Sequence, residues 1–102
     1  MSIEGIWDLT ISTPIGKIKA EVELRRDGDL LSGTAQGVGE QVPLRELALD
    51  GNELTWKQAV TKPMRLNLAF AVTIAGESLS GTAKAGRLPA SKVIGQRRVL
   101  PA

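Results

Sequence analysis

The chain has 102 residues and a formal net charge of +2, and its 42% apolar and 24% charged residues are typical of a globular protein. It contains no histidine, cysteine or tyrosine. This composition excludes a thiolate nucleophile, an imidazole base, a histidine-activated serine, the usual zinc ligand sets, and haem ligation by histidine or cysteine. We therefore expect no metal site, no cofactor and no catalytic residue of these classes.

Targeting and partner signals are also absent from the sequence. It shows no positively charged leader followed by an apolar core, and no apolar run long enough to cross a bilayer. We expect a cytoplasmic protein that binds no membrane, and the lack of cysteine agrees with that compartment. Basic and acidic residues are interleaved at residues 17–26, which is typical of a solvated outer face. We therefore expect no nucleic-acid partner.

Apolar and polar residues alternate with a period of two along most of the chain, which predicts short β-strands and no helix. The leucines of residues 44–49 break this phase, which predicts a β-bulge near Arg45 and Glu46. In chain order, the alternating segments lie at residues 7–11, 17–25, 54–60, 64–74 and 93–97, and the strand with the broken phase lies at residues 44–49.

An internal repeat relates the two halves of the chain. Residues 28–35, Gly-Asp-Leu-Leu-Ser-Gly-Thr-Ala, recur at residues 76–83 as Gly-Glu-Ser-Leu-Ser-Gly-Thr-Ala. Self-similarity at a fixed offset indicates copies of one structural unit. We therefore predict two four-strand repeats, at approximately residues 3–50 and 51–100.

The connections between the predicted strands alternate in kind. Tight hairpin signals with glycine lie at residues 27–28, 50–52 and 75–77, and the other connections are longer or contain proline. In a meander every second connection lies at the same end, so the longer loops would surround an open mouth. We predict an all-β fold, an eight-stranded antiparallel up-and-down barrel, as a single domain of residues 1–102.

The first and last predicted strands carry a recognisable pattern. Gly5-Ile6-Trp7 opens the first strand, and Arg97 lies on the last. This resembles the lipocalin (calycin) family, in which a Gly-x-Trp on the first strand packs under an arginine from the last strand. The resemblance implies a barrel that binds apolar ligands in its interior. The chain is also similar to small bacterial proteins of unassigned function that have Trp, Thr-Pro-x-Gly, Ser-Gly-Thr and Asp-Gly at comparable places.

Four residues are expected to close the barrel at its tight-turn end. Trp7 and Trp56 begin equivalent strands of the two repeats, and large aromatic side chains supply much buried area. The guanidinium of Arg97 can stack on an indole face, and Gly5 precedes Trp7 in the lipocalin-like pattern. The alternative interpretation is that both tryptophans form walls on which a ligand stacks.

The candidate ligand site is the half of the interior near the mouth. Gly33 and Gly81 lie on strands that would face each other across the barrel, so inward-facing glycines would leave two walls bare of side chains. Alternatively, the glycines serve curvature and closure. Gln58 is the one polar residue in an inward register, where its amide is either satisfied by the protein or available to a ligand. The candidate ligand-binding residues are Ile11, Ile18, Gly33, Ala35, Gln58, Val60, Met64, Leu66, Gly81 and Ala83.

Three functions stay open on the sequence alone. The first is non-catalytic binding of a small apolar or amphipathic ligand by apolar burial. The second is a cofactor-free isomerase, cyclase or hydratase that confines its substrate, with Glu46 as a carboxylate that a bulge could turn inward. The third is a structural or interaction barrel with a filled core. Ala69 and Ala71 on the outer face are interpreted either as a homodimer contact or as ordinary surface alanines.

Overall fold

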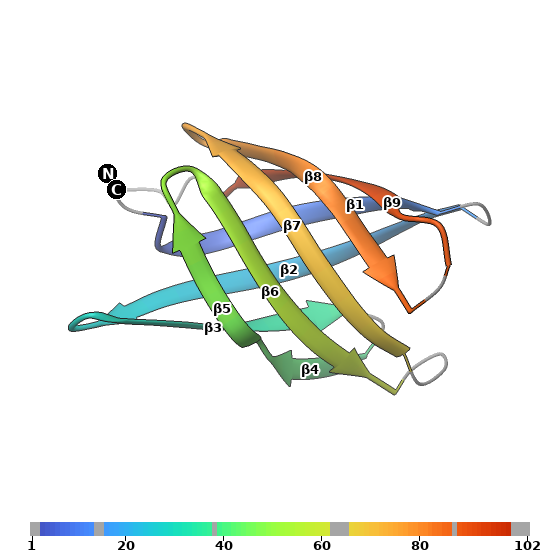
Figure 1. Cartoon of the computed structure of the whole chain (residues 1–102), viewed down its shortest axis with the longest axis horizontal. Helices are drawn as coiled ribbons and strands as arrows, with labels where there is room; N and C mark the ends of the chain where they lie inside the picture. Colours follow the sequence, from blue (N-terminus) through green and yellow to red (C-terminus); the bar gives the residue numbers. More distant parts are fainter. Residues whose placement is uncertain (1–2, 14–15, 38, 62–65, 87, 99–102) are drawn as a thin grey trace.

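The computed structural model describes residues 3–13, 16–37, 39–61, 66–86 and 88–98. The strands are β1 (Gly5–Thr13), β2 (Gly16–Asp27), β3 (Leu30–Gly37), β4 (Glu40–Pro43), β5 (Arg45–Asp50), β6 (Glu53–Val60), β7 (Leu66–Ala75), β8 (Ser78–Ala85) and β9 (Ser91–Arg97). They form one antiparallel sheet in the order β4-β3-β2-β1-β9-β8-β7-β6-β5, which curls into a nearly closed barrel (Figure 1). Among the described residues, no helix is long and apolar enough to cross a membrane.

The two ends of the barrel differ, as the alternation of connections predicts. Strands meet in tight hairpins at residues 27–30, 50–53 and 75–78, and the central glycine of each hairpin has a φ between +63° and +66°. These hairpins lie at the end of the barrel where the two termini also lie (Figure 1). We call this the closed end. The opposite end, where β1, β6 and β8 finish and β2 and β9 begin, is called the mouth.

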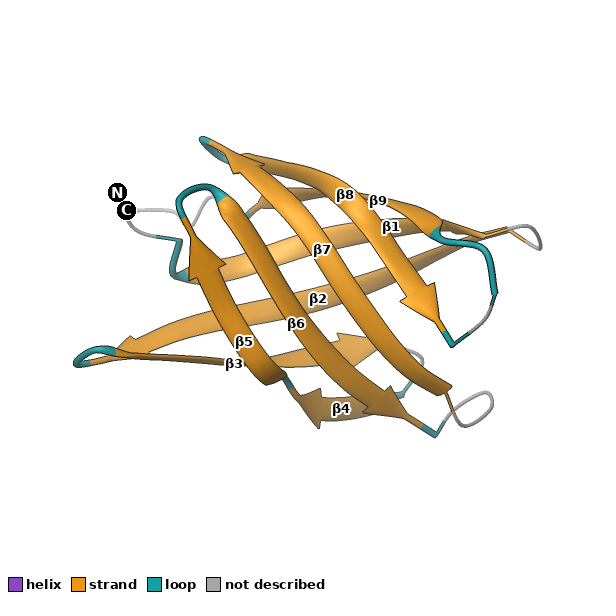
Figure 2. Cartoon of the chain, viewed as in Figure 1, coloured by secondary structure: helices purple, strands orange, loops and turns teal. Residues whose placement is uncertain are grey.

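The predicted number of eight strands is wrong, because the described residues form nine (Figure 2). The additional strand is β4, which lies in a stretch expected to be a connection, before the segment at residues 44–49 that was expected to be the fourth strand. β4 pairs with β3, and β5 pairs with β6. The predicted bulge is present, since the register between β5 and β6 shifts between Arg45 and Ala48, and Glu46 has a φ of +50°. The structure does not show the two four-strand repeats as units, and they stay a prediction.

The barrel closes at a seam between its two edge strands, β4 and β5. The amide N–H of Leu44 donates to the carbonyl of Gly33 at 2.9 Å, which ties the break between these strands to β3. Beside the mouth, the Glu40 carboxylate accepts hydrogen bonds from the hydroxyl of Thr61 and from its backbone N–H, the latter at 2.8 Å. The seam is therefore held by individual contacts in place of a strand ladder.

The apolar face of each strand fills the closed half of the barrel. Trp7 and Leu54 are 0% exposed, and Leu24 and Trp56 are 2% exposed. Full burial of a leucine contributes about 1.5–3 kcal/mol, so this cluster supplies much of the stability of the fold. At Gly95 an added Cβ would lie 2.4 Å from the side chain of Leu9. Leucine side chains therefore occupy the space that the missing side chain leaves there.

Candidate functional site

Arg97 lies over Trp7 at the closed end. The two residues are partners across β1 and β9, and the guanidinium carbon is 5.5 Å from the centre of the indole ring. The indole N–H donates to the carbonyl of Ile3 at 3.0 Å. At Gly5 an added Cβ would lie 3.4 Å from the Arg97 side chain, and the φ there is +129°. The structure thus brings together three of the four residues expected to close the barrel.

Glu77 holds the far side of the Arg97 guanidinium. The Nε–H of Arg97 donates to the Glu77 carboxylate at 2.7 Å. This hydrogen bond lowers the pKa of Glu77 below its usual value, because it favours the charged carboxylate. The carboxylate thereby fixes the orientation of the guanidinium over the indole.

The fourth closure residue, Trp56, lies on the opposite wall with Gln58. The Trp56 indole N–H donates to the Gln58 side-chain oxygen at 3.0 Å, and its ring stacks on Phe70 at 4.7 Å between centroids. The amide nitrogen of Gln58 has no hydrogen-bond partner among the described residues. Because no fully buried polar side-chain atom of those residues lacks a partner, this nitrogen keeps some contact with solvent. The Gln58 side-chain oxygen therefore has a structural role, whereas the two N–H donors of its amide nitrogen have no partner among the described residues.

The small residues of β3 and β8 face the interior, but the glycines do not form bare walls. Ala35 and Ala83 are buried. An added Cβ at Gly33 would lie 2.5 Å from the backbone oxygen of Glu23, and one at Gly81 would lie 2.0 Å from that of Ala71. Both glycines therefore let neighbouring strands approach closely where the sheet bends, which is the curvature interpretation.

Towards the mouth, several inward-facing apolar residues of β1, β2 and β7 are only partly covered. Ile18 is 38% exposed, because β2 extends past the last pair of its ladder with β3, at Glu21. Ile11, Ala20 and Leu68 are half-buried against the core. Apolar inner surface is thus accessible at Ile18 on β2 and in part at its neighbours, whereas Val93, the partner of Ile11 on β9, is 0% exposed.

Of the candidate ligand residues, one lies outside the described residues and two are described by their backbone alone. Met64 lies outside the described residues. The backbones of Val60 and Leu66 are partners where β6 and β7 meet the mouth. The assignment of the candidate set to ligand binding stays a prediction.

Glu46 does not face the interior. Its side chain is 69% exposed on the outer surface, where its carboxylate lies 3.3 Å from the Lys57 ammonium. The bulge turns this residue outward, so the suggestion that it could be aimed at a confined substrate is wrong. Within the described part of the chain, no cluster of acidic residues could hold a metal ion.

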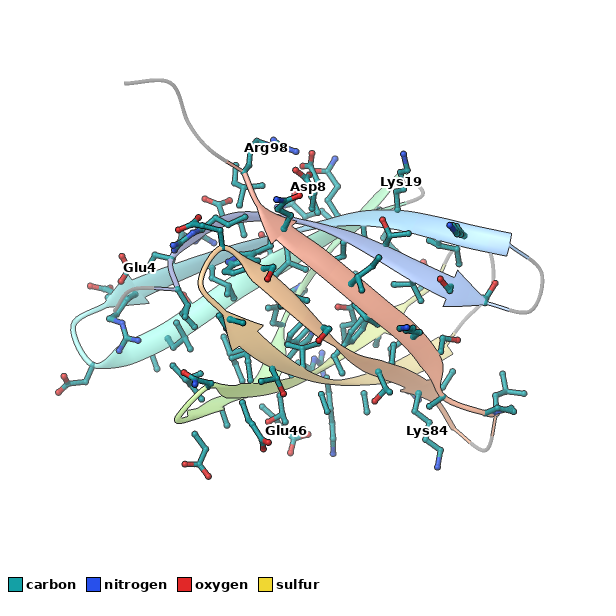
Figure 3. All side chains as sticks on the ribbon, turned by 90° about the horizontal axis from the view of Figure 1, so that it is seen from above. Glu4, Asp8, Lys19, Glu46, Lys84 and Arg98 are labelled. Atoms are coloured by element: carbon teal, nitrogen blue, oxygen red, sulfur yellow. The ribbon has the colours of Figure 1, made fainter. Side chains whose placement is uncertain are left out.

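Two carboxylates on the outer face of β1 and β2 share one arginine. Asp8 and Glu21 are partners across these strands, and the Arg98 guanidinium donates to both, at 2.6 and 2.5 Å. These hydrogen bonds, led by the one to Asp8, raise the pKa of Arg98 above its usual value. Figure 3 shows Asp8, Lys19 and Arg98 together on this side of the barrel. These contacts hold Arg98, the last described residue, against β1 and β2.

Comparison with known proteins shows the fold. No protein-family model and no curated protein match the chain. A redesigned β-barrel superposes with a TM-score of 0.75 at 11% identity, over 95% of this chain and 92% of that chain. The structure titled REP1-NXSQ fatty acid transporter superposes with a TM-score of 0.59 at 13% identity, over 97% of this chain and 98% of that chain. At such identities the likeness establishes a β-barrel architecture alone.

Proposed function

We propose that the protein binds a small apolar or amphipathic molecule inside the mouth half of the barrel, without catalysing a reaction. The observation that carries the proposal is the contrast between the two halves of the interior. The closed half is filled by buried aromatic and leucine side chains, while Ile11, Ile18 and Leu68 leave apolar surface accessible at the mouth. Accessible apolar surface on an inner wall is the usual lining of a small-molecule site.

The gain in free energy would come from covering this surface. Each Å² of apolar area that a ligand covers contributes about 25 cal/mol before the losses of association. The free N–H donors of Gln58 supply one polar contact deeper in the barrel. An apolar body with one hydrogen-bond acceptor, such as a carboxylate, carbonyl or hydroxyl oxygen, fits this arrangement.

Two further lines support a ligand of this class. One of the solved barrels that resemble this chain in fold is titled a fatty acid transporter, so an acyl chain is a suitable probe. The Gly5, Trp7 and Arg97 arrangement agrees with the lipocalin-like pattern, whose family binds apolar ligands in the barrel. We infer a lipocalin-like binding mode from these two together.

The proposal is tested by titrating the protein with dodecanoic acid and 1-dodecanol, using isothermal titration calorimetry and the thermal unfolding midpoint. Ala85 lies on β8 at the mouth, partnered with Leu68, and Ala71 lies on the outer face of β7. Ala85→Phe places a ring over the inner surface and should weaken binding at least tenfold. Ala71→Phe is the matched control, and should change affinity less than twofold.

A second variant tests the polar contact. Gln58→Glu keeps an oxygen acceptor for the Trp56 indole but replaces the two N–H donors by a carboxylate. We expect dodecanoic acid to lose more affinity than 1-dodecanol, because only the acid meets a like charge. Equal binding to the parent and Ala85→Phe would contradict binding inside the mouth, and no binding of either probe to a folded parent would favour the filled-core alternative.

A further inference from the structure

A row of basic residues crosses the outer face of the sheet from β5 to β8. Arg45 is the partner of Lys57, Lys57 of Ala69, and Ala69 of Lys84. All four side chains are exposed. Together with Asn67 they line a surface hollow of about 460 Å³. Because Ala69 is small, the centre of the row is open between the cations on either side.

The charges in this hollow are not balanced. Its three cations face one carboxylate, that of Glu46, which lies 3.3 Å from the Lys57 ammonium. In the part of the chain that the structure describes, neither Arg45 nor Lys84 forms an ion pair. Adjacent strands are about 4.8 Å apart, so Arg45 and Lys57 lie within a Debye length of each other and repel, while Lys84 lies three strands from Arg45. Two positive charges are therefore left over in one hollow.

The backbone beside the hollow is strained. Glu46 is the non-glycine residue with a positive φ, +50°, and the register shift of β5 occurs at the same place. Such a conformation is unfavourable for a non-glycine residue, and residues of this kind cluster at ligand clamps and active sites. β-Bulges likewise occur beside functional sites, where they redirect a side chain. Here the bulge directs the Glu46 carboxylate to Lys57 at the rim of the hollow.

We propose that this hollow binds a phosphomonoester group, with inorganic phosphate as its simplest form. A phosphomonoester carries about −1.5 to −2 charge near neutral pH, which matches the excess of two cations. The planar guanidinium of Arg45 can donate two parallel hydrogen bonds to phosphate oxygens, and Lys84 contributes a point charge. The amide of Asn67 adds a neutral donor, and Glu46 competes with the anion for Lys57. Figure 3 shows Glu46 and Lys84 on the side of the barrel away from Asp8 and Arg98.

The test is a titration of ¹⁵N-labelled protein with inorganic phosphate at constant ionic strength, with sodium chloride as the reference salt. We expect amide shifts to saturate on β5–β8. The double variant Arg45→Gln/Lys84→Gln should bind at least tenfold more weakly. A matched double variant, Lys19→Gln/Lys92→Gln, removes the same charge elsewhere and should change affinity less than twofold. Glu46→Gln should bind about threefold more tightly, because the competing carboxylate is gone.

Two further arms identify the source of the phosphomonoester. Glycerol 3-phosphate represents a soluble ligand, and vesicles of phosphatidylcholine with 20% phosphatidic acid represent a lipid headgroup. Binding of either one that is lost in Arg45→Gln/Lys84→Gln supports the site and names its source. The proposal is overturned if phosphate acts no differently from chloride, if the two double variants weaken binding equally, or if Glu46→Gln leaves the affinity unchanged.

Discussion

At the scale of single residues, the closed end depends on how one arginine is held. Arg97 contacts the Trp7 ring and donates to the Glu77 carboxylate, and it also donates to the backbone oxygen of Glu4 at 3.3 Å. A cation over an indole contributes about 0.5–1 kcal/mol at an exposed site. The contribution depends on orientation, which Glu77 supplies. The pairing of Trp7 with Arg97 was expected from the resemblance to the lipocalin pattern, in which an arginine from the last strand packs on the tryptophan of Gly-x-Trp.

The contact of Glu77 with Arg97 predicts a pH dependence. The pKa of Glu77 is lower in the folded protein than its usual value of 4.5. Its contribution to stability is therefore present above pH 4.5 and is lost as the pH falls through the lowered folded pKa. The unfolding midpoints of the parent and of Glu77→Gln should differ at pH 7 and converge in acid. Unfolding curves at pH 2–7 measure this, and a difference that is constant with pH would contradict it.

Gln58 shows what single-residue inference from sequence could and could not supply. The alternation of β6 correctly predicts that it faces inward, and it is 9% exposed. Of the two uses considered for its amide, the structural one applies to the oxygen, which accepts from Trp56, and a ligand contact by the nitrogen stays a prediction. The spacing of Trp56 and Gln58 places them on one face of a strand. The sequence does not show that Trp56 stacks on Phe70, nor that its indole N–H reaches the Gln58 oxygen.

At the scale of the strands, the seam between β4 and β5 could not be predicted from the sequence. The phase break among the leucines of residues 44–49 indicates a bulge, but not that the strand transfers from one partner to another. That transfer depends on the backbone conformation of Glu46 and on the bond from Leu44 to Gly33. The row of cations around the hollow was missed for a similar reason. Arg45, Lys57 and Lys84 become neighbours only once the register of β5–β8 is known.

Glu40 is expected to hold this seam closed. Its carboxylate accepts two hydrogen bonds from Thr61, which lies just after β6. Glu40→Ala should lower the free energy of unfolding by about 1–2 kcal/mol, since hydrogen bonds to charged groups contribute about 1.5–3 kcal/mol each before solvent exposure reduces them. Urea unfolding measures this change, and hydrogen exchange of the Thr61 amide should accelerate. The matched control is Glu53→Ala at an exposed hairpin; an equal loss in both variants would exclude a specific role for Glu40.

At the scale of the whole molecule, alternation and turn signals were sufficient to predict an antiparallel barrel with two unlike ends. The tight hairpins do gather at one end, because every second connection of a meander lies there, and their glycines adopt the positive φ that such turns need. The state of the interior could not be predicted from the same pattern. Gly33 and Gly81 suggested open walls, yet backbone atoms occupy the space beside them. Accessible apolar surface instead lies nearer the rim, where β2 extends past β3.

The most direct measurement of the central claim is the location of a bound probe. The parent protein is mixed with ¹³C-labelled dodecanoic acid, and intermolecular nuclear Overhauser effects are recorded to assigned methyl groups. We predict contacts from the acyl chain to Ile11, Ile18 and Leu68, with none to the outward-facing methyl groups of Ala71 and Ile94. Contacts confined to the outer face, or no contacts with a folded protein at saturating probe, would contradict binding inside the mouth of the barrel.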